Sequence, residues 1–273
     1  SDYLIRRYGG QSDNAEQAWE LIKNANYDSG VRLTPELFGL RTGGVPKNIG
    51  KKDIGYDAED LENALRLLLE DFDRFSGSEG YLYDLSEIMR QICSNYTVLK
   101  YHEVIDARDA KDLEAFRQAK EEFLNAFDVL NEVQKTRQNQ LAGEWIGKAQ
   151  DRAAEYDDFS KSTFEMNAKS LITTWGSSGG SLVDYGFRTY EGMFLDLIKS
   201  NWTEYLDQVE QNLIDGTAID VPSNTRGYIE KYWKWVIGDQ DYTRDAADSP
   251  EGVLSIAQRV LDECVFTGEL DPD

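Results

Sequence analysis

The amino-acid sequence predicts an all-α fold, a helical array or bundle of about nine to ten helices in which residues 1–273 form one domain. Three observations support this prediction. Apolar residues recur at three- and four-residue spacing along nearly every periodic segment. The chain has only 5 prolines, which suits long uninterrupted helices. No run of alternating β-branched residues indicates a sheet, and no internal repeat of fixed period is present.

The first helices are predicted from their apolar stripes. Residues 13–26 place small and large apolar side chains on one face, and residues 57–75 carry a second stripe. The two stripes consist of Ala15, Ala18, Trp19 and Ile22, and of Leu61, Leu65, Leu68, Phe72 and Phe75. Between them, residues 30–56 are rich in glycine and include Pro35 and Pro46, which predicts a long irregular loop.

Two longer helices are predicted in the middle of the chain. The first is expected to start at Asp84, which forms a capping-box-like pair with Glu87, and to end at about residue 105. The second covers residues 110–136, where apolar residues stand in near-heptad register. Those residues are Leu113, Phe116, Phe123, Phe127 and Leu130.

Shorter helices complete the prediction, and two of them contain a glycine. The predicted ranges are 139–156, 159–174, 182–199, 201–215, 224–237 and 250–265. Gly143 lies inside the first and Gly192 inside the third. Each of these glycines costs helix stability unless a neighbour packs closely there.

Composition narrows the classes of function. Hydrophobic residues make up 40% and aromatic residues 12%, enough for a sizeable core. A net charge of −22 argues against nucleic acid and against anionic lipid as partners, because both would be repelled. No apolar run is long enough for membrane insertion, and no signal peptide is visible. The acidity indicates a soluble protein, suited to an extracellular or salty setting.

The few cysteine and histidine residues predict no metal site and no cofactor. Cys93 and Cys264 are far apart in sequence, and they match neither a disulfide framework nor zinc-ligand spacing. Cys93 follows Ile92 in an apolar helical pattern, which favours a buried free thiol. His102 is the only histidine, which excludes a centre that needs two.

Several stretches occur together in a specific order. They are RRYG at Arg6–Gly9 with AWEL at 18–21, YDLSEIMRQ at Tyr83–Gln91, LAGEWIGKAQ at Leu141–Gln150, EMNAKSLITTWG at Glu165–Gly176 with SLVDYG at Ser181–Gly186, and NWTEYL at Asn201–Leu206. In these stretches the chain resembles the C-terminal all-helical domain of the alpha-N-acetylglucosaminidases, glycoside hydrolases that release terminal alpha-linked N-acetylglucosamine. The family often has arginine at the position of Lys169 and usually an apolar residue at that of Ser86.

The resemblance implies a larger enzyme. Family members combine a small N-terminal domain, a catalytic TIM-like barrel and this helical domain, so the barrel is expected upstream of residue 1 in the same polypeptide. The barrel carries two catalytic glutamates of a retaining mechanism, which requires carboxyl groups about 5–5.5 Å apart. A (β/α)₈ barrel takes about 250 residues of alternating strand and helix, which this helical pattern does not allow. No catalytic residue is therefore assigned here, and the isolated chain is expected to be inactive.

The resemblance also implies a substrate site. The family's pocket lies between barrel and helical domain, with Trp175, Leu182 and Tyr185 on the helical side. An aromatic ring can stack on the C–H face of a pyranose, and an acetamido methyl group needs an apolar niche. Trp175 ends a predicted helix before a Gly/Ser connector, and Leu182 and Tyr185 share a face of the next helix. From spacing alone, these aromatic residues would be core residues.

Three functions are therefore open. The first is a non-catalytic domain of a secreted or cell-surface bacterial alpha-N-acetylglucosaminidase that acts on glycans with terminal alpha-N-acetylglucosamine. The second is an independent carbohydrate- or protein-binding helical module. The third is a self-contained hydrolase that uses local acids such as Glu165 and Asp184.

Arg90 is expected to anchor an acidic partner such as Asp84, and the remaining tryptophans are expected in the core or at a domain contact.

Overall fold

The computed structural model describes residues 2–25, 56–176, 188–217 and 225–265. These residues form eleven α-helices, with one 3₁₀ turn and one π-helical segment. The elements are α1 (Asp2–Tyr8), α2 (Asp13–Lys23), α3 (Ala58–Glu70), α4 (Phe72–Phe75), α5 (Glu79–Ala110), α6 (Leu113–Lys135), η3 (Gln138–Gln140), α7 (Ala142–Arg152), α8 (Asp158–Leu171), η4 (Phe194–Lys199), α9 (Ser200–Asp215), α10 (Thr225–Val236) and α11 (Pro250–Glu263). No strand forms within these ranges, where Leu141 and Glu191 make an isolated β-bridge. The all-α prediction is confirmed.

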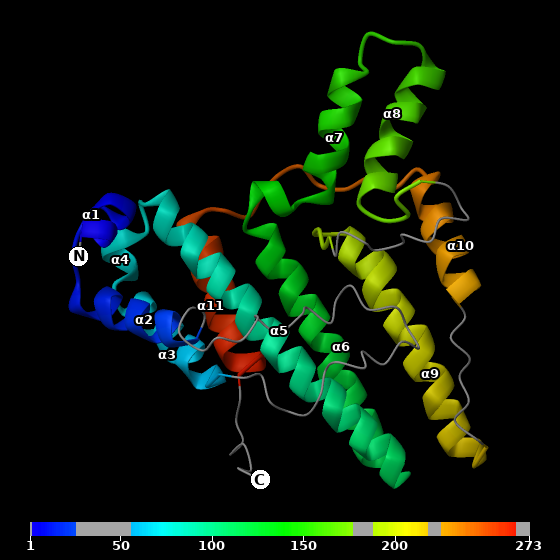
Figure 1. Cartoon of the computed structure of the whole chain (residues 1–273), viewed down its shortest axis with the longest axis horizontal. Helices are drawn as coiled ribbons and strands as arrows, with labels where there is room; N and C mark the ends of the chain where they lie inside the picture. The colour runs from blue at the N-terminus through cyan, green and yellow to red at the C-terminus, as the bar shows by residue number, and fades with distance from the viewer. Residues whose placement is uncertain (1, 26–55, 177–187, 218–224, 266–273) are drawn as a thin grey trace.

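The helices are arranged around a central pair (Figure 1). The long helices α5 and α6 run side by side, with α9 next to α6 and α11 against both members of the pair. Helices α1 to α4 gather at one end of α5, and α7 and α8 form a hairpin that projects from the bundle. None of the described helices is both long and apolar enough to cross a membrane.

The helix starts follow from local capping. Side chains of Ser12, Ser78, Asp112, Asp157 and Ser249 each accept a hydrogen bond from a backbone N–H in the first turn of the helix that follows. The prediction that Asp84 caps the fifth helix is therefore wrong. Ser78 caps it, and Asp84 lies inside the helix as a buried carboxylate.

Other predicted bounds also need correction. Asp71 separates α3 from α4, so residues 57–75 are two helices, although their five stripe residues are all buried. Helix α5 continues to Ala110 and ends where Lys111 takes a left-handed conformation. In the predicted helix at 182–199, residues 188–192 are not helical. The predicted loop lies outside the described residues except for Tyr56.

Aromatic side chains fill the core between the central helices. Phe127 of α6 stacks on Phe194 of η4 with ring centroids 5.2 Å apart. Phe123 meets Trp202 of α9 edge to face, also at 5.2 Å. All four side chains are buried, so the near-heptad stripe of α6 faces the core as predicted, except at its partly exposed first residue, Leu113.

An extended segment, residues 237–249, connects α10 to α11 and crosses the base of the hairpin (Figure 1, orange). We call it the crossing segment. A Cβ atom added to Gly143 would lie 2.1 Å from the carbonyl oxygen of Thr243, and one added to Gly192 would lie 2.4 Å from the Tyr242 ring. A close neighbour therefore packs on each glycine, and one segment supplies both contacts, although Gly192 lies in a turn and not inside a helix.

Candidate functional site

Trp175 lies just beyond the C-terminal end of α8 with its side chain 44% exposed. Its φ of 53° is in the left-handed region, which is uncommon for a bulky residue. Hydrogen bonds hold this turn: the Trp175 N–H donates to the Ser170 carbonyl at 2.8 Å, and the Gly176 N–H donates to the Ser170 hydroxyl at 2.9 Å. The indole is thus held at the surface by a fixed backbone turn. Leu182 and Tyr185 lie outside the described residues.

Buried Lys169, in the last turn of α8, anchors this helix to its neighbours. Its ammonium group pairs with Glu165 at 2.5 Å and donates to the Gly238 carbonyl at 2.6 Å. It also lies 5.7 Å from the centroid of the Trp235 ring. The lysine at this position therefore ties α8 to α10 and to the start of the crossing segment, without the two-pronged geometry of arginine.

Glu165 has the environment of a structural carboxylate. Burial raises its pKa, but hydrogen bonds from Lys169 and from Gln150 outweigh burial and hold the pKa below its usual range. A general acid in a glycosidase needs the opposite shift, a raised pKa. This environment argues against the self-contained hydrolase, whose second candidate acid, Asp184, lies outside the described residues.

The helices α7 and α8, with the turn between them and the turn after α8, expose a set of large apolar side chains, which we call the hairpin surface. It consists of Trp145, Tyr156, Phe159, Phe164, Leu171 and Trp175. Phe159, near the tip, is 81% exposed, and Tyr156 stacks on Phe164 at 5.8 Å. At the base, the Trp145 indole N–H donates to the Ala168 carbonyl at 2.8 Å and its ring stacks on Tyr190.

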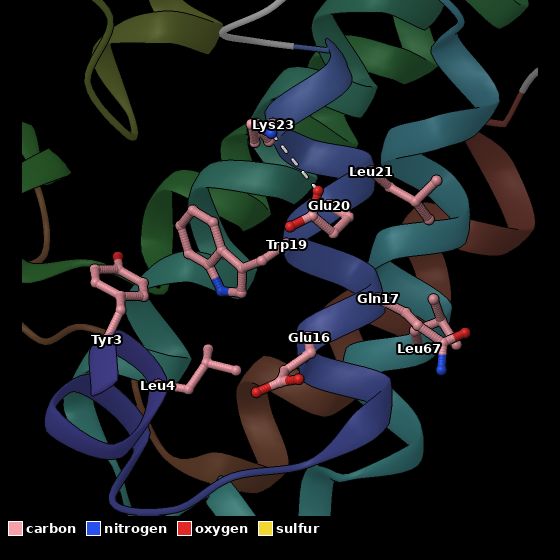
Figure 2. Close-up of a pocket in the computed structure, with 9 residues that line it drawn as sticks. All are labelled: Tyr3, Leu4, Glu16, Gln17, Trp19, Glu20, Leu21, Lys23 and Leu67. Atoms are coloured by element: carbon pink, nitrogen blue, oxygen red, sulfur yellow. Dashed lines mark ion pairs between the residues drawn. The ribbon is translucent and has the colours of Figure 1, made fainter. Parts of the chain in front are cut away.

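A second surface lies at the other end of the molecule, between α1, α2 and α3 (Figure 2). It is a pocket of about 950 Å³, in which the rings of Tyr3 and Trp19 meet edge to face at 5.0 Å. Glu16 and Glu20 extend from α2 beside these rings, and Glu20 pairs with Lys23 at 3.7 Å. The pocket therefore combines an aromatic wall with an acidic edge.

A polar network holds Trp19 from behind. Its indole N–H donates to the Tyr8 hydroxyl at 2.9 Å, and that hydroxyl donates to Asp84 at 2.9 Å. Arg7 forms a bidentate ion pair with the same carboxylate, one arm of which is 2.6 Å long. Burial and the nearby Asp84 charge raise the pKa of the Tyr8 hydroxyl, so it remains a donor. The predicted Arg90–Asp84 anchor is wrong, because Arg90 binds Glu87 and Arg7 takes its place.

Two of the stretches noted in the sequence contain the two halves of this network, but nothing in their spacing indicated that they are in contact. Arg7 and Tyr8 stand in the RRYG stretch and Asp84 in YDLSEIMRQ, so each motif contains one side of a buried contact.

Within the described ranges, no group of three or more histidine, cysteine, aspartate or glutamate side chains could hold a metal ion.

The chain matches a family model and several known proteins. The model of the alpha-N-acetylglucosaminidase (NAGLU) C-terminal domain matches residues 1–263. The human protein named alpha-N-acetylglucosaminidase is 27% identical over 81% of this chain and 29% of its own length. A Clostridium perfringens enzyme, CpGH89 with two Glu→Gln substitutions, was solved with its substrate GlcNAc-alpha-1,4-galactose. It aligns with a TM-score of 0.85 and 27% identity, over 97% of this chain and 31% of that one.

A second structure, a family 89 glycoside hydrolase from Clostridium perfringens in complex with 2-acetamido-1,2-dideoxynojirmycin, gives the same TM-score of 0.85 at 28% identity. It covers 98% of this chain and 31% of that chain. The present chain thus spans less than a third of the length of these relatives. Because the family model covers all but its last residues, the chain belongs to the family of alpha-N-acetylglucosaminidase (NAGLU) C-terminal domains.

Proposed function

We propose that this chain is the non-catalytic helical domain of a retaining alpha-N-acetylglucosaminidase. In this proposal it packs on the catalytic barrel of the same polypeptide and forms one wall of the pocket for terminal alpha-linked N-acetylglucosamine. Trp175, Leu182 and Tyr185 would contribute to that wall. The acidic balance of the chain favours an extracellular or cell-surface bacterial setting.

The hairpin surface supports packing against another domain. It holds six of the ten large hydrophobic side chains that are exposed in the described part of the chain. Exposed apolar residues that are scattered singly need no partner, but a concentration on one projecting element is typical of an interaction site. About two thirds of the length of each relative lies outside the matched domain, so a barrel-sized partner is available in such enzymes.

The observation that carries the pocket assignment is the held turn at Trp175. A core tryptophan would be buried, as Trp202 is, whereas Trp175 is presented at the surface by a strained backbone that hydrogen bonds keep in place. Rigid aromatic rings bind ligands well because little freedom is lost on binding. Trp175 also lies at the base of the hairpin surface, where a pocket between two domains would open.

The test is Trp175→Ala in an enzyme that includes the barrel. A lost stacking contact of about 1–3 kcal/mol corresponds to a fall in kcat/KM of roughly five- to 150-fold. Trp175→Phe, which keeps an aromatic face, should lose less, and Ile214→Ala on the exposed side of α9 should change nothing. The isolated chain, expected to release no sugar, is the blank.

Measurement of the urea midpoint on the same preparations separates binding from folding. If Trp175→Ala lowers the midpoint so far that the free energy of unfolding falls by about 3–5 kcal/mol, as for a core tryptophan, while folded molecules keep wild-type kinetics, the pocket assignment is wrong. Turnover by the isolated chain that Glu165→Gln abolishes would instead establish the self-contained hydrolase.

A further inference from the structure

Two buried hydroxyl groups lie in the same turn as the exposed Trp175 side chain. Ser170 and Thr174 are both buried at the C-terminal end of α8, whereas Trp175, the residue after Thr174, is 44% exposed. The two hydroxyl oxygens lie 3.2 Å apart. One short segment therefore combines a buried polar pair with an aromatic ring at the surface.

Both hydroxyl groups bind the residue that follows Trp175. The Ser170 hydroxyl donates to the Gly176 carbonyl at 3.1 Å and accepts a hydrogen bond from the Gly176 N–H at 2.9 Å. The Thr174 hydroxyl donates to the same carbonyl, also at 3.1 Å. Gly176 is thus held through its N–H and through its carbonyl group.

The backbone of Trp175 is fixed from both sides. Its own N–H donates to the Ser170 carbonyl at 2.8 Å, and the bound Gly176 follows it directly. A left-handed φ of 53° brings Cβ close to the following carbonyl oxygen and is disfavoured for residues other than glycine. Without the two hydroxyl groups, we expect this segment to relax to a commoner backbone conformation, which would turn the indole away from its present direction.

We propose that Ser170 and Thr174 are positioning residues for Trp175, and that their hydroxyl groups hold the indole in its binding orientation before the sugar arrives. This role rests on the proposed function, in which Trp175 contacts the terminal N-acetylglucosamine. Neither hydroxyl needs to touch the sugar, because both are buried and both are used within the turn.

Positioning of this kind should affect substrate binding more than the chemical step. If the held conformation is only partly populated, the apparent affinity falls by that fraction, because the sugar binds only the competent form. Once the sugar is bound, the ring occupies the same place as before, and the complex reacts at its usual rate. Loss of a hydrogen bond of ordinary strength then corresponds to a rise in KM of about two- to tenfold with kcat unchanged.

The end of α8 offers matched variants for a test. Ser170→Ala removes one hydroxyl, and Thr174→Val removes the other while it keeps the shape of the side chain. Thr174→Ser keeps the hydroxyl and should therefore behave like the wild type. Thr173→Val is the control, because the buried Thr173 hydroxyl donates instead to the Lys169 carbonyl, at 2.7 Å.

The first measurement uses the chain itself and does not require the barrel. In proton–nitrogen correlation spectra, the indole N–H of Trp175 is identified by its loss in Trp175→Phe. The heteronuclear NOE of this group reports motion on the picosecond-to-nanosecond timescale. We expect the NOE to fall in Ser170→Ala and Thr174→Val, and to stay near the wild-type value in Thr174→Ser and Thr173→Val.

The second measurement uses an enzyme that includes the barrel. Ser170→Ala and Thr174→Val should each raise KM for a chromogenic alpha-N-acetylglucosaminide by about two- to tenfold, with kcat unchanged. Thr174→Ser and Thr173→Val should keep the wild-type KM. Because KM does not depend on the amount of folded enzyme, a partial loss of stability in these variants does not imitate the expected effect.

Three results would overturn the proposal. An unchanged NOE in both Ser170→Ala and Thr174→Val would show that the hydroxyl groups do not hold the ring. A lower NOE with a wild-type KM would show that the sugar does not need a held ring. An equal rise of KM in Thr173→Val would show a general effect of the end of α8. A failure of the proposed function is distinct from these, because Trp175→Ala would then itself leave kcat/KM unchanged, and the role of both hydroxyl groups would fall with it.

Discussion

The central bundle and the α7–α8 hairpin have similar sequence patterns, but the bundle buries its aromatic side chains and the hairpin exposes several of its own. Both carry aromatic residues on helices. In the bundle, Phe123 and Phe127 are fully buried against η4 and α9, whereas Phe159 and Phe164 of the hairpin are exposed. Periodicity shows which side of a helix is apolar, but the neighbours along the rest of the chain decide whether anything covers that side.

The polar contacts differ in the same way. Ion pairs join separate helices of the bundle: Lys100 binds Glu122 at 2.6 Å, Lys120 binds Glu210 at 2.8 Å, and Lys199 binds Asp128 at 2.6 Å. The hairpin is held mainly at its base, by Lys169 and by the crossing segment. Most large apolar side chains of the described bundle helices are thus buried within this chain, whereas the hairpin leaves several of its own exposed.

The largest effect should come from the bundle. Phe127→Ala removes a buried ring that stacks on Phe194, and we expect a loss of about 3–5 kcal/mol in the free energy of unfolding. Phe164→Ala in the hairpin is the matched change on an exposed ring and should cost much less. Urea denaturation followed by circular dichroism measures both. Equal losses would contradict the distinction between the two regions.

An intermediate effect is expected where the hairpin meets the crossing segment. Gly143→Ala should destabilise the chain by about 1–3 kcal/mol, because the new methyl group would collide with the Tyr242 and Thr243 carbonyl oxygens. This cost outweighs the better helix propensity of alanine, about 1 kcal/mol. Gly77→Ala is the control, since nothing lies within 4 Å of its added Cβ. A stable Gly143→Ala chain would show that the crossing segment can move away.

The fold could be predicted from sequence because most of it depends on local pattern. The stripes of α2, α3 and α6 repeat every three or four residues, and each of those helices forms. Errors arose where the decisive partner is distant. Asp84 looks like a cap when only its neighbours are considered, but Arg7 binds it from 77 positions away.

The crossing segment could not be predicted for a related reason. It has no hydrophobic periodicity. What its position requires of the sequence is found in other elements, where glycines such as Gly143 and Gly192 leave room for it. Each glycine allowed for a close neighbour but did not identify it.

The site was predicted from resemblance rather than from spacing. Spacing alone placed Trp175 in the core, and the structure shows it partly exposed at a turn that Ser170 holds. The left-handed backbone at Trp175 depends on those hydrogen bonds and has no signature in the sequence. Whether Trp175, Leu182 and Tyr185 contact a sugar stays a prediction.

The smallest effect should come from the tip of the hairpin. Phe159→Ala alters a ring that is 81% exposed, so little buried surface is lost and alanine favours the first turn of α8 at least as well. We expect the isolated chain to change by no more than about 0.5 kcal/mol in urea denaturation. In an enzyme that includes the barrel, the same change should cost more if the hairpin surface is covered there, because the ring would then leave a packed interface. A loss above about 1 kcal/mol in the isolated chain would show that Phe159 packs within the domain, and the contrast between bundle and hairpin would fail at its clearest residue.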